Sequence, residues 1–225
     1  AVKFQMFDSK RLWGDDRIAH LELDEAEMAN VAWHCKAIGI EFLCTPFGVP
    51  EVEFLRPLLR RVKLASGSLE RWALLAAVLA TGLPVILSTG MADMDRVAGA
   101  AAMFHVEHLT LLHCTSSYPC QTEEVNLAAM DALRARWPHL AGGGYSAHPP
   151  GIVIPLAAVA RGAAVLEKHL TMDRQAEGPD HKASIEPKEF RIMVDAIRTV
   201  EAALGSPEKR LQPSEAATAA QWYGH

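Results

Sequence analysis

The sequence predicts an α/β fold in which parallel strands and helices alternate, most simply a TIM (β/α)8 barrel. Short aliphatic or β-branched runs alternate with helical patterns, and Gly, Pro, Ser, Thr or Asp marks each change, as consecutive βαβ units require. The 225 residues hold seven such units, whereas a closed barrel has eight and about 250 residues. We therefore expect a barrel that lacks its first βα unit, with an open doubly wound sheet as the alternative.

Seven apolar runs have the length and composition of buried strands. No G-x-G-x-x-G motif or P-loop follows any of them. This weakens the open-sheet alternative, because nucleotide-binding sheets of that type carry such loops. The predicted strands lie at residues 1–7, 40–45, 61–66, 84–89, 109–115, 143–148 and 164–170.

Two helices have clear start and stop signals. Asp24 and Glu27 resemble a capping box, and the apolar face that follows ends at Gly39. The last helix begins near Pro187, keeps apolar residues at helical spacing, and ends at Gly205. Further helices are predicted at residues 52–59, 69–81, 94–104, 125–137 and 151–161.

Composition and charge exclude several classes of protein. Half the residues are apolar and 22% are charged, which is typical of a globular domain, here residues 1–205. A net charge of −5 gives no broad electrostatic basis for binding nucleic acid. The four cysteines form no C-x-x-C pair, so we expect a reducing compartment, the cytoplasm.

Two segments need separate interpretation. Residues 72–92 carry no charge and have the length of a membrane span, but Gly82 and Pro84 interrupt them. We therefore predict a buried helix, a turn and a buried strand, and no membrane partner. The polar, Ala-rich residues 206–225 are expected to form a linker or a poorly ordered tail.

Polar residues gather at the carboxyl ends of the predicted strands, which form the active-site face of a parallel barrel. We expect them to line one site, although Ser and Thr at these positions also cap helices. Two lysines on apolar strands are costly to bury without an anion, which favours a phosphorylated or acidic substrate. The residues concerned are Lys3, Gln5, Thr45, Lys63, Ser66, Ser88, Ser116, Ser146, His148, Glu167 and His169.

The histidines at the ends of the last two strands form a candidate metal site. Neighbouring strands lie about 4.8 Å apart, so His148 and His169 could share one divalent ion. The alternative is that both rings are hydrogen-bonded or contact substrate. In the loop that follows, Asp180 either steers a substrate hydroxyl or proton, or forms an Asx turn. Tyr118 similarly offers a substrate wall or a turn.

Lys168 suggests a different hypothesis, a Schiff-base lysine like that of lysine-dependent aldolases. Strand alternation argues against it. If Glu167 and His169 face the barrel interior, Lys168 faces the helices, where its ammonium pairs or reaches solvent. Lys3 and Lys63 are better placed to face inward.

Nine motifs of the chain occur in the order and spacing of one enzyme family. They are Lys3-Phe-Gln, Cys44-Thr-Pro-Phe, Lys63-Leu-Ala-Ser-Gly, Leu87-Ser-Thr-Gly-Met, His113-Cys-Thr-Ser-Ser-Tyr-Pro, Glu124-Val-Asn-Leu, Gly144-Tyr-Ser-Ala-His, Glu167-Lys-His-Leu-Thr and Glu177-Gly-Pro-Asp-His. From residue 1 to about residue 205, the chain resembles the sialic acid synthases, which include the N-acetylneuraminate, legionaminate and pseudaminate synthases and related spore-coat polysaccharide proteins.

The resemblance implies a homodimeric TIM-barrel enzyme that condenses phosphoenolpyruvate with an N-acetylated mannosamine-type sugar and releases phosphate and a nonulosonic acid. It implies Mn²⁺ or Mg²⁺ as cofactor, held by His148 and His169. The expected substrate-binding residues are Thr45, Lys63, Ser66, Ser88, Ser116, Tyr118 and Ser146. The expected catalytic residues are Lys3, Gln5, Glu167 and Asp180.

The chain departs from the family pattern in three respects. From the resemblance, we expect the family's first strand with its active-site Glu to precede residue 1, and its C-terminal antifreeze-like domain, whose Arg enters the partner's site, to lie outside these residues. Ala147 stands where the family usually has Asp. Because lost support of a metal ligand typically costs about 10–100-fold in affinity or activity, we expect these residues alone to be poorly active. A degenerate barrel that only binds sugar or assembles is a further alternative.

Overall fold

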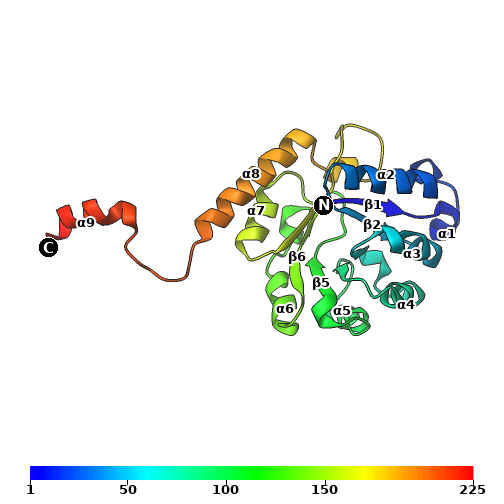
Figure 1. Ribbon diagram of the computed structural model, residues 1–225, viewed down its shortest axis with the longest axis horizontal. Helices are drawn as coiled ribbons and strands as arrows, with labels where there is room; N and C mark the ends of the chain where they lie inside the picture. Colours follow the sequence, from blue (N-terminus) through cyan, green and yellow to red (C-terminus); the bar gives the residue numbers. More distant parts are fainter. Residues whose placement is uncertain (225) are drawn as a thin grey trace.

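The computed structural model describes residues 1–224, in which parallel strands form the centre of the molecule (Figure 1). Strands β1 and β2 form one sheet, and β3, β4, β5, β6 and β7 form a second sheet in chain order. Every pairing is parallel. The strands are β1 (Val2–Met6), β2 (Phe42–Pro46), β3 (Val62–Leu64), β4 (Val85–Ser88), β5 (Leu109–His113), β6 (Gly142–Ala147) and β7 (Val165–Lys168).

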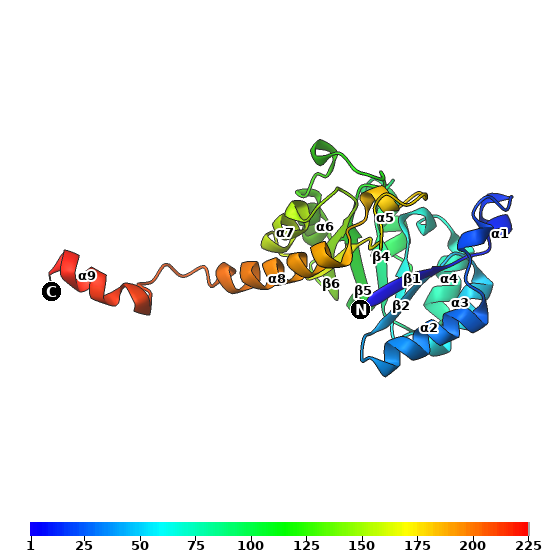
Figure 2. The same ribbon diagram turned by 90° about the horizontal axis from the view of Figure 1, so that it is seen from above.

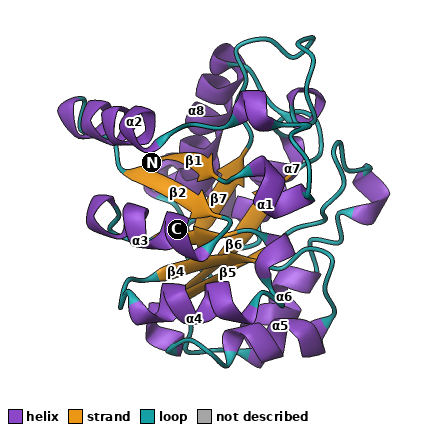
Figure 3. Ribbon diagram, turned by 90° about the vertical axis from the view of Figure 1, so that its right-hand side faces the viewer, coloured by secondary structure: helices purple, strands orange, loops and turns teal. Residues whose placement is uncertain are grey.

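Helices surround the curved strands on the outside, as Figure 3 shows. The chain therefore has the predicted α/β fold, with its sheet curved into a half-barrel. The helices are α1 (Ser9–Trp13), α2 (Glu25–Ala37), α3 (Val49–Leu55), α4 (Trp72–Ala80), α5 (Met94–Ala101), α6 (Ala129–Arg136), α7 (Val153–Ala160), α8 (Pro187–Leu204) and α9 (Ala216–Tyr223).

The two helices with clear signals end where the sequence predicts. The Asp24 carboxylate accepts the Glu27 amide at 2.8 Å, and the Glu27 carboxylate accepts the Asp24 amide at 2.9 Å, which completes the capping box of α2. Helix α8 begins at Pro187, and Gly205 follows its last residue. Helix α1 was not predicted, because its five residues are too few to show a period.

The segment after α8 differs from the expectation of little structure. It forms α9, whose alanines favour a helix. Its large side chains do not pack, since Trp222 and Tyr223 are each 77% exposed. In both views the segment extends away from the strands (Figures 1 and 2).

The core has an outer and an inner part. The larger part lies between the outer faces of the strands and the helices, and includes Met28, Leu55 and Leu75. The smaller part, formed by Leu43, Ile86 and Leu112, lies on the inner face, because Ile86 pairs in register with Lys63 and Leu43 with Lys3. The polar side chains of the inner face lie next to this inner apolar layer.

The charge-free stretch divides as predicted into α4, a turn and β4. In the described part of the chain, no helix has both the length and the hydropathy that crossing a bilayer requires.

Candidate active site

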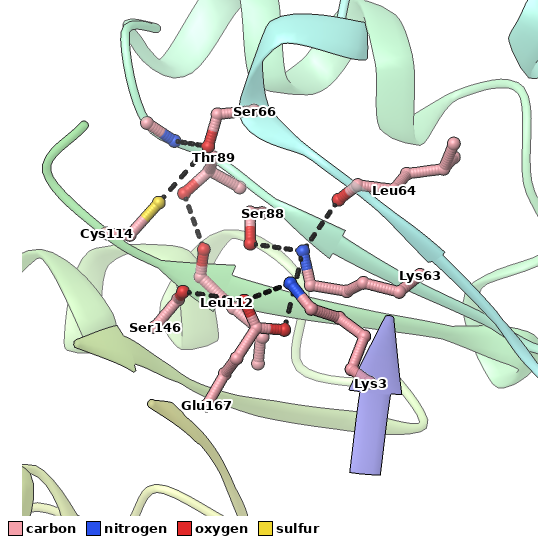
Figure 4. Close-up of polar contacts among 11 residues, drawn as sticks. Lys3, Lys63, Leu64, Ser66, Ser88, Thr89, Leu112, Cys114, Ser146 and Glu167 are labelled. Atoms are coloured by element: carbon pink, nitrogen blue, oxygen red, sulfur yellow. Dashed lines mark hydrogen bonds and ion pairs between the residues drawn. The ribbon is translucent and has the colours of Figure 1, made fainter. Parts of the chain in front are cut away.

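Side chains from strands far apart in the sequence meet on the inner face, near the carboxyl ends of the strands (Figure 4). Lys3 comes from β1, Lys63 from β3, Ser88 from β4, Ser146 from β6 and Glu167 from β7. Strand alternation explains their convergence, because side chains two residues apart share a face. We refer to these five residues as the lysine–glutamate cluster.

Glu167 is the centre of the lysine–glutamate cluster. Its Oε1 accepts hydrogen bonds from Lys3 Nζ at 3.2 Å and from Ser146 Oγ at 3.1 Å, and its Oε2 lies 3.7 Å from Lys63 Nζ. Burial alone would raise the pKa of Glu167, but the two ammonium groups outweigh it and lower this pKa to about 2. Glu167 is therefore ionised at neutral pH.

Lys63 is almost fully buried, with 2% of its surface exposed. Its Nζ donates to Ser88 Oγ at 2.7 Å and to the Leu64 carbonyl at 2.9 Å. Burial lowers the pKa of Lys63 to about 8, although the Glu167 carboxylate opposes this shift. Two ammonium groups share one carboxylate here, so the lysine–glutamate cluster carries one uncompensated positive charge.

A second group of small side chains lies beside the lysine–glutamate cluster. Ser66 Oγ accepts the Gly90 amide at 2.9 Å and lies 3.2 Å from Cys114 Sγ. The hydroxyl oxygens of Thr45 and Ser116 are buried and have no hydrogen-bond partner within residues 1–224. Buried hydroxyls without partners are uncommon and are expected where a bound ligand supplies the partner.

Gly90 leaves the space that this group of side chains needs. A Cβ at residue 90 would lie 2.2 Å from Ser116 Oγ and 3.0 Å from both Cys114 Sγ and Ser66 Oγ. We expect Gly90→Ala to lower the free energy of unfolding by about 1–3 kcal/mol through overpacking. Denaturant unfolding measures this change.

The control for Gly90→Ala is Gly99→Ala on α5, where the nearest atom to an added Cβ is 3.6 Å away. Gly99→Ala is expected to leave stability unchanged or to raise it, because Ala favours a helix. Adding Ser116→Ala to Gly90→Ala should restore part of the lost stability, since it removes the closest contact. Equal stability of Gly90→Ala and the wild type would contradict this explanation.

The two predicted metal ligands lie side by side. The ring centroids of His148 and His169 are 5.4 Å apart. His148 Nδ1 donates to the Thr115 carbonyl at 2.6 Å, and His169 Nδ1 lies 3.3 Å from Asp180 Oδ2. Each ring therefore has its Nδ1 engaged by an acceptor and its Nε2 left for a ligand, which is the usual arrangement of metal-binding histidines.

The charge state of the histidine pair fits the same role. Burial lowers the pKa of His148 to about 4, so this ring is neutral at pH 7 and its Nε2 carries a lone pair. The hydrogen bond with His169 lowers the pKa of Asp180 and keeps it ionised. Within residues 1–224, no group of three or more His, Cys, Asp or Glu side chains is arranged to hold a metal. Imidazole nitrogens are ligands that several divalent ions accept, and this pair alone would leave the other coordination positions of such an ion open.

The other predicted residues are placed around these groups. The Tyr118 ring lies 4.2 Å from the His148 ring and 5.6 Å from the His169 ring, measured between centroids, so Tyr118 forms a wall of the histidine pair. Gln5 and Thr45 are partners in the register of β1 and β2. In the described structure, neither side chain hydrogen-bonds to the other candidate residues.

Sequence reasoning missed three contributors to the site. Cys114 was assigned no role in the site, but its thiol contacts Ser66. The Thr115 carbonyl orients His148, and the glycine of the Ser-Thr-Gly motif leaves room for Ser116. The role of Gly90 could have been predicted, because this glycine directly follows two hydroxyl residues at the end of a strand. The role of the Thr115 carbonyl could not, because every residue type has a backbone carbonyl.

Ala147 is fully buried in an apolar cluster with Tyr145 and Ala158. It therefore faces the helices, on the opposite side of β6 from Ser146 and His148. The predicted weakening of His148 orientation at this position finds no support in the contacts, since the Thr115 carbonyl holds the ring.

Lys168 also faces away from the lysine–glutamate cluster, as strand alternation predicts. Its Nζ contacts backbone carbonyls, including that of Ala183 at 2.9 Å. An ammonium engaged in this way has no approach to a substrate carbonyl on the inner face, which disfavours a Schiff base at Lys168.

Parallel strands whose carboxyl ends carry lysines, hydroxyls and imidazoles form the catalytic face of α/β-barrel enzymes, and this chain shares that arrangement. The model of the NeuB family matches residues 1–209. The chain therefore belongs to the NeuB family, and the family resemblance seen in its motifs is confirmed.

Named relatives agree with this assignment. The chain is 39% identical over 204 residues to an N,N'-diacetyllegionaminic acid synthase of Campylobacter jejuni, covering 88% of this chain and 60% of the relative. It is 36% identical over 217 residues to the N-acetylneuraminate-9-phosphate synthase of Homo sapiens, covering 94% of this chain and 60% of the relative. The chain thus spans about 60% of the length of these two relatives.

Solved structures share the fold. An N-acetylneuraminic acid synthetase from Leptospira borgpetersenii, in complex with citrate, matches with a TM-score of 0.89 at 34% identity, over 97% of this chain and 79% of that chain. A spore coat polysaccharide biosynthesis protein of Bacillus subtilis matches with a TM-score of 0.81 at 29% identity, over 96% and 67%. A truncated 3-deoxy-D-arabino-heptulosonate 7-phosphate synthase of Thermotoga maritima, at 14% identity and a TM-score of 0.70, shows a common fold only.

Proposed function

We propose that the protein condenses phosphoenolpyruvate with the open aldehyde form of an N-acetylated mannosamine-type sugar, giving a nonulosonic acid and phosphate. The names of the relatives support this class of reaction. The observation that carries the proposal is the buried Lys63 ammonium, held beside Ser88 and near the Glu167 carboxylate.

The net charge of the lysine–glutamate cluster matches this substrate. One uncompensated positive charge in a buried site favours an anion, because an ammonium without a counter-charge is costly to bury. The phosphate and carboxylate of phosphoenolpyruvate supply that charge. The hydroxyls of Ser66 and Ser116 lie beside the lysine–glutamate cluster and would donate hydrogen bonds to the same oxygens.

In the proposed reaction, the methylene carbon of phosphoenolpyruvate forms a bond with the aldehyde carbon of the sugar. Water supplies the oxygen for carbon 2, and the phosphate leaves. Lys63 and Lys3 hold the anionic groups and stabilise negative charge that develops on the departing phosphate. Glu167 is ionised at neutral pH, so it orients the two ammonium groups and Ser146 and does not donate a proton itself.

His148 and His169 would hold Mn²⁺ or Mg²⁺ through their Nε2 atoms. When bound, such an ion polarises the sugar aldehyde and makes its carbon more reactive. The Thr115 carbonyl and the Asp180 carboxylate fix the two rings in the required tautomer. Tyr118 covers the pair on one side, and Gln5 and Thr45 provide polar groups on the β1 and β2 side of the sugar.

We further propose that the curved sheet belongs to a closed barrel. Strands β1 and β7 are the first and last strands of the chain, and the Lys3–Glu167 ion pair joins them across the inner face. In a closed parallel barrel, the two ends of the strand sequence meet at one site in this way. A homodimer is proposed from the family resemblance alone.

Binding of phosphoenolpyruvate is expected to depend on pH through Lys63. The pKa of Lys63 is about 8, so its amine is protonated and positively charged below this pH and neutral above it. The affinity for the anion should therefore be constant between pH 6.5 and 7.5 and fall up to about tenfold per pH unit above pH 8. Calorimetric titration with phosphoenolpyruvate at several pH values measures this dependence.

Lys63→Arg is the control for the pH dependence, because Arg stays charged over the whole range. The variant should bind phosphoenolpyruvate with an affinity that no longer falls above pH 8. If the wild type shows the same affinity at pH 7 and pH 9.5, Lys63 is not the group that holds the anion.

Release of phosphate tests the proposed function directly. The full-length protein is incubated with phosphoenolpyruvate and Mn²⁺, with and without N-acetylmannosamine or its diacetamido relatives. We expect phosphate release that requires the sugar, together with a product whose mass equals sugar plus pyruvate. Absence of phosphate release with every such sugar, in protein that is folded by circular dichroism, would reject the proposal.

A further inference from the structure

Lys168 is a half-buried lysine that the proposed reaction does not use. It lies on β7 between Glu167 and His169, and its side chain points to the outer face of the strand. Its Nζ contacts the carbonyl oxygens of Pro149 at 2.5 Å, Ala183 at 2.9 Å and Ala147 at 3.4 Å. An ammonium has three N–H donors, so three carbonyl acceptors can use all of them.

These carbonyls belong to the segments that carry the histidine pair and its acceptor. Ala147 and Pro149 flank His148 in the chain. Ala183 ends the short 3-10 helix η6 (His181–Ala183), which Asp180 precedes as its N-cap residue. The remaining segment is that of Lys168 itself, which directly precedes His169. One ammonium thus connects the backbone segments that carry His148, His169 and Asp180, although it contacts none of these three side chains.

Backbone hydrogen bonds connect Ala183 to Asp180. The Asp180 carbonyl accepts hydrogen bonds from the Ala183 amide at 3.1 Å and from Ser184 Oγ at 2.7 Å. The Ile185 amide, two residues further on, donates to the His169 carbonyl at 2.9 Å. Displacement of Ala183 therefore moves the Asp180 carboxylate relative to the His169 ring that it orients.

The partners of Lys168 are all neutral. In the described residues, no Asp or Glu oxygen lies within 4 Å of its Nζ. Glu189 is the carboxylate whose charge acts on Lys168, and it does so without direct contact. Burial of an ammonium that makes no direct contact with a carboxylate is unfavourable for folding. Apolar residues of similar length would fill the same space at the outer face, so packing alone does not require a lysine here.

We propose that Lys168 is a positioning residue that sets the distance and orientation of the His148–His169 pair and of Asp180, by binding the backbone of the three segments. This inference rests on the proposed metal-binding role of the pair. It assigns Lys168 no contact with substrate, and it makes the lysine of the Glu-Lys-His motif part of the metal site.

The test compares Mn²⁺ binding in Lys168→Met, Lys168→Arg and the wild type, by calorimetry on the full-length protein. Met keeps the length of the side chain and removes the donors. Arg keeps the charge, but its donors lie on separate nitrogens of a planar group. It therefore cannot reproduce the three hydrogen bonds that the single Lys168 nitrogen makes to the carbonyls. We expect Mn²⁺ affinity to fall about 10–100-fold in Lys168→Met, the usual cost of lost support to metal ligands, and by a smaller factor in Lys168→Arg.

Two readouts separate positioning from general damage to the structure. The affinity for phosphoenolpyruvate without metal should stay within twofold of the wild type, because the lysine–glutamate cluster lies on the other face of β7. Lys182→Met, which removes an exposed lysine of the same 3-10 helix, should leave the Mn²⁺ affinity unchanged. If Lys168→Met does not fold, the Mn²⁺ affinity of Lys168→Arg relative to the wild type tests the inference.

Equal Mn²⁺ affinity of the wild type and every folded Lys168 variant would overturn the inference. So would a parallel loss of phosphoenolpyruvate and Mn²⁺ affinity, because that result indicates a purely structural lysine. A wild type that binds no Mn²⁺ at all would instead reject the proposed metal-binding function, so the two failures are distinguishable.

Discussion

Replacement of Lys63 by Met is expected to weaken phosphoenolpyruvate binding strongly without unfolding the protein. Lys63 is 2% exposed, and its Nζ is held by Ser88 and the Leu64 carbonyl. Without this ammonium, the charge of Lys3 is fully offset by Glu167 and the site is neutral. Loss of a buried, hydrogen-bonded charge contact costs about 2–5 kcal/mol of binding free energy, so the dissociation constant should rise by about 30-fold to several thousand-fold.

The stability of Lys63→Met should behave differently from its binding. Burial lowers the pKa of Lys63, which means that the charged form of this side chain is less stable in the folded protein than in water. A well-packed apolar side chain in place of a buried charge is often neutral or stabilising. We expect the free energy of unfolding to stay within about 1 kcal/mol of the wild type or to increase. Thermal unfolding and calorimetric titration measure the two effects.

The exposed Lys36 on α2 offers a matched control, since Lys36→Met removes the same charge far from the inner face. This variant should bind phosphoenolpyruvate like the wild type. Tight binding of phosphoenolpyruvate by Lys63→Met would show that the anion lies elsewhere and would remove the main support for the proposed function.

Replacement of either His148 or His169 by Asn is expected to remove metal binding and turnover together. Each ring offers its Nε2, because its Nδ1 is engaged by the Thr115 carbonyl or by Asp180. Loss of a direct ligand should weaken Mn²⁺ binding by more than the roughly 10–100-fold seen for supporting groups. An ion that polarises a carbonyl stabilises the transition state by several kcal/mol, so turnover should fall about 1,000-fold.

The controls for the histidine variants use a different site and a different ligand. His139→Asn changes an exposed ring and should leave Mn²⁺ binding and turnover intact. The affinity of His148→Asn and His169→Asn for phosphoenolpyruvate should match the wild type, since the lysine–glutamate cluster is unchanged. Normal Mn²⁺ affinity of either variant would exclude that ring as a ligand.

The regular part of the fold was predictable from sequence because it depends on periodicity. Alternation along β7 correctly separates Glu167 from Lys168, and the same rule brings Lys63 and Ser88 to one face. Strand ends were predicted less well. The run 61–66 was predicted as one strand, but β3 ends at Leu64 and Ser66 begins a 3-10 turn, because the hydroxyl leaves the ladder to accept the Gly90 amide.

The irregular part of the site depends on contacts that periodicity does not encode. Tyr118 stacks near His148 because the loop after β5 folds back over the next strand, as the hydrogen bond from the Cys120 amide to the His148 carbonyl shows. The Thr115 carbonyl and the carbonyls around Lys168 are backbone groups, which every residue type carries. A sequence pattern can place the histidines near each other, but it cannot show what holds their rings.

The structure of the full-length protein with phosphoenolpyruvate and Mn²⁺ bound tests the central claim most directly. We predict phosphate and carboxylate oxygens within hydrogen-bond distance of Lys63 Nζ and of the Ser66 or Ser116 hydroxyl, and anomalous density for Mn²⁺ between the Nε2 atoms of His148 and His169. An anion bound away from Lys63, or Mn²⁺ bound with both rings turned from it, would contradict the account.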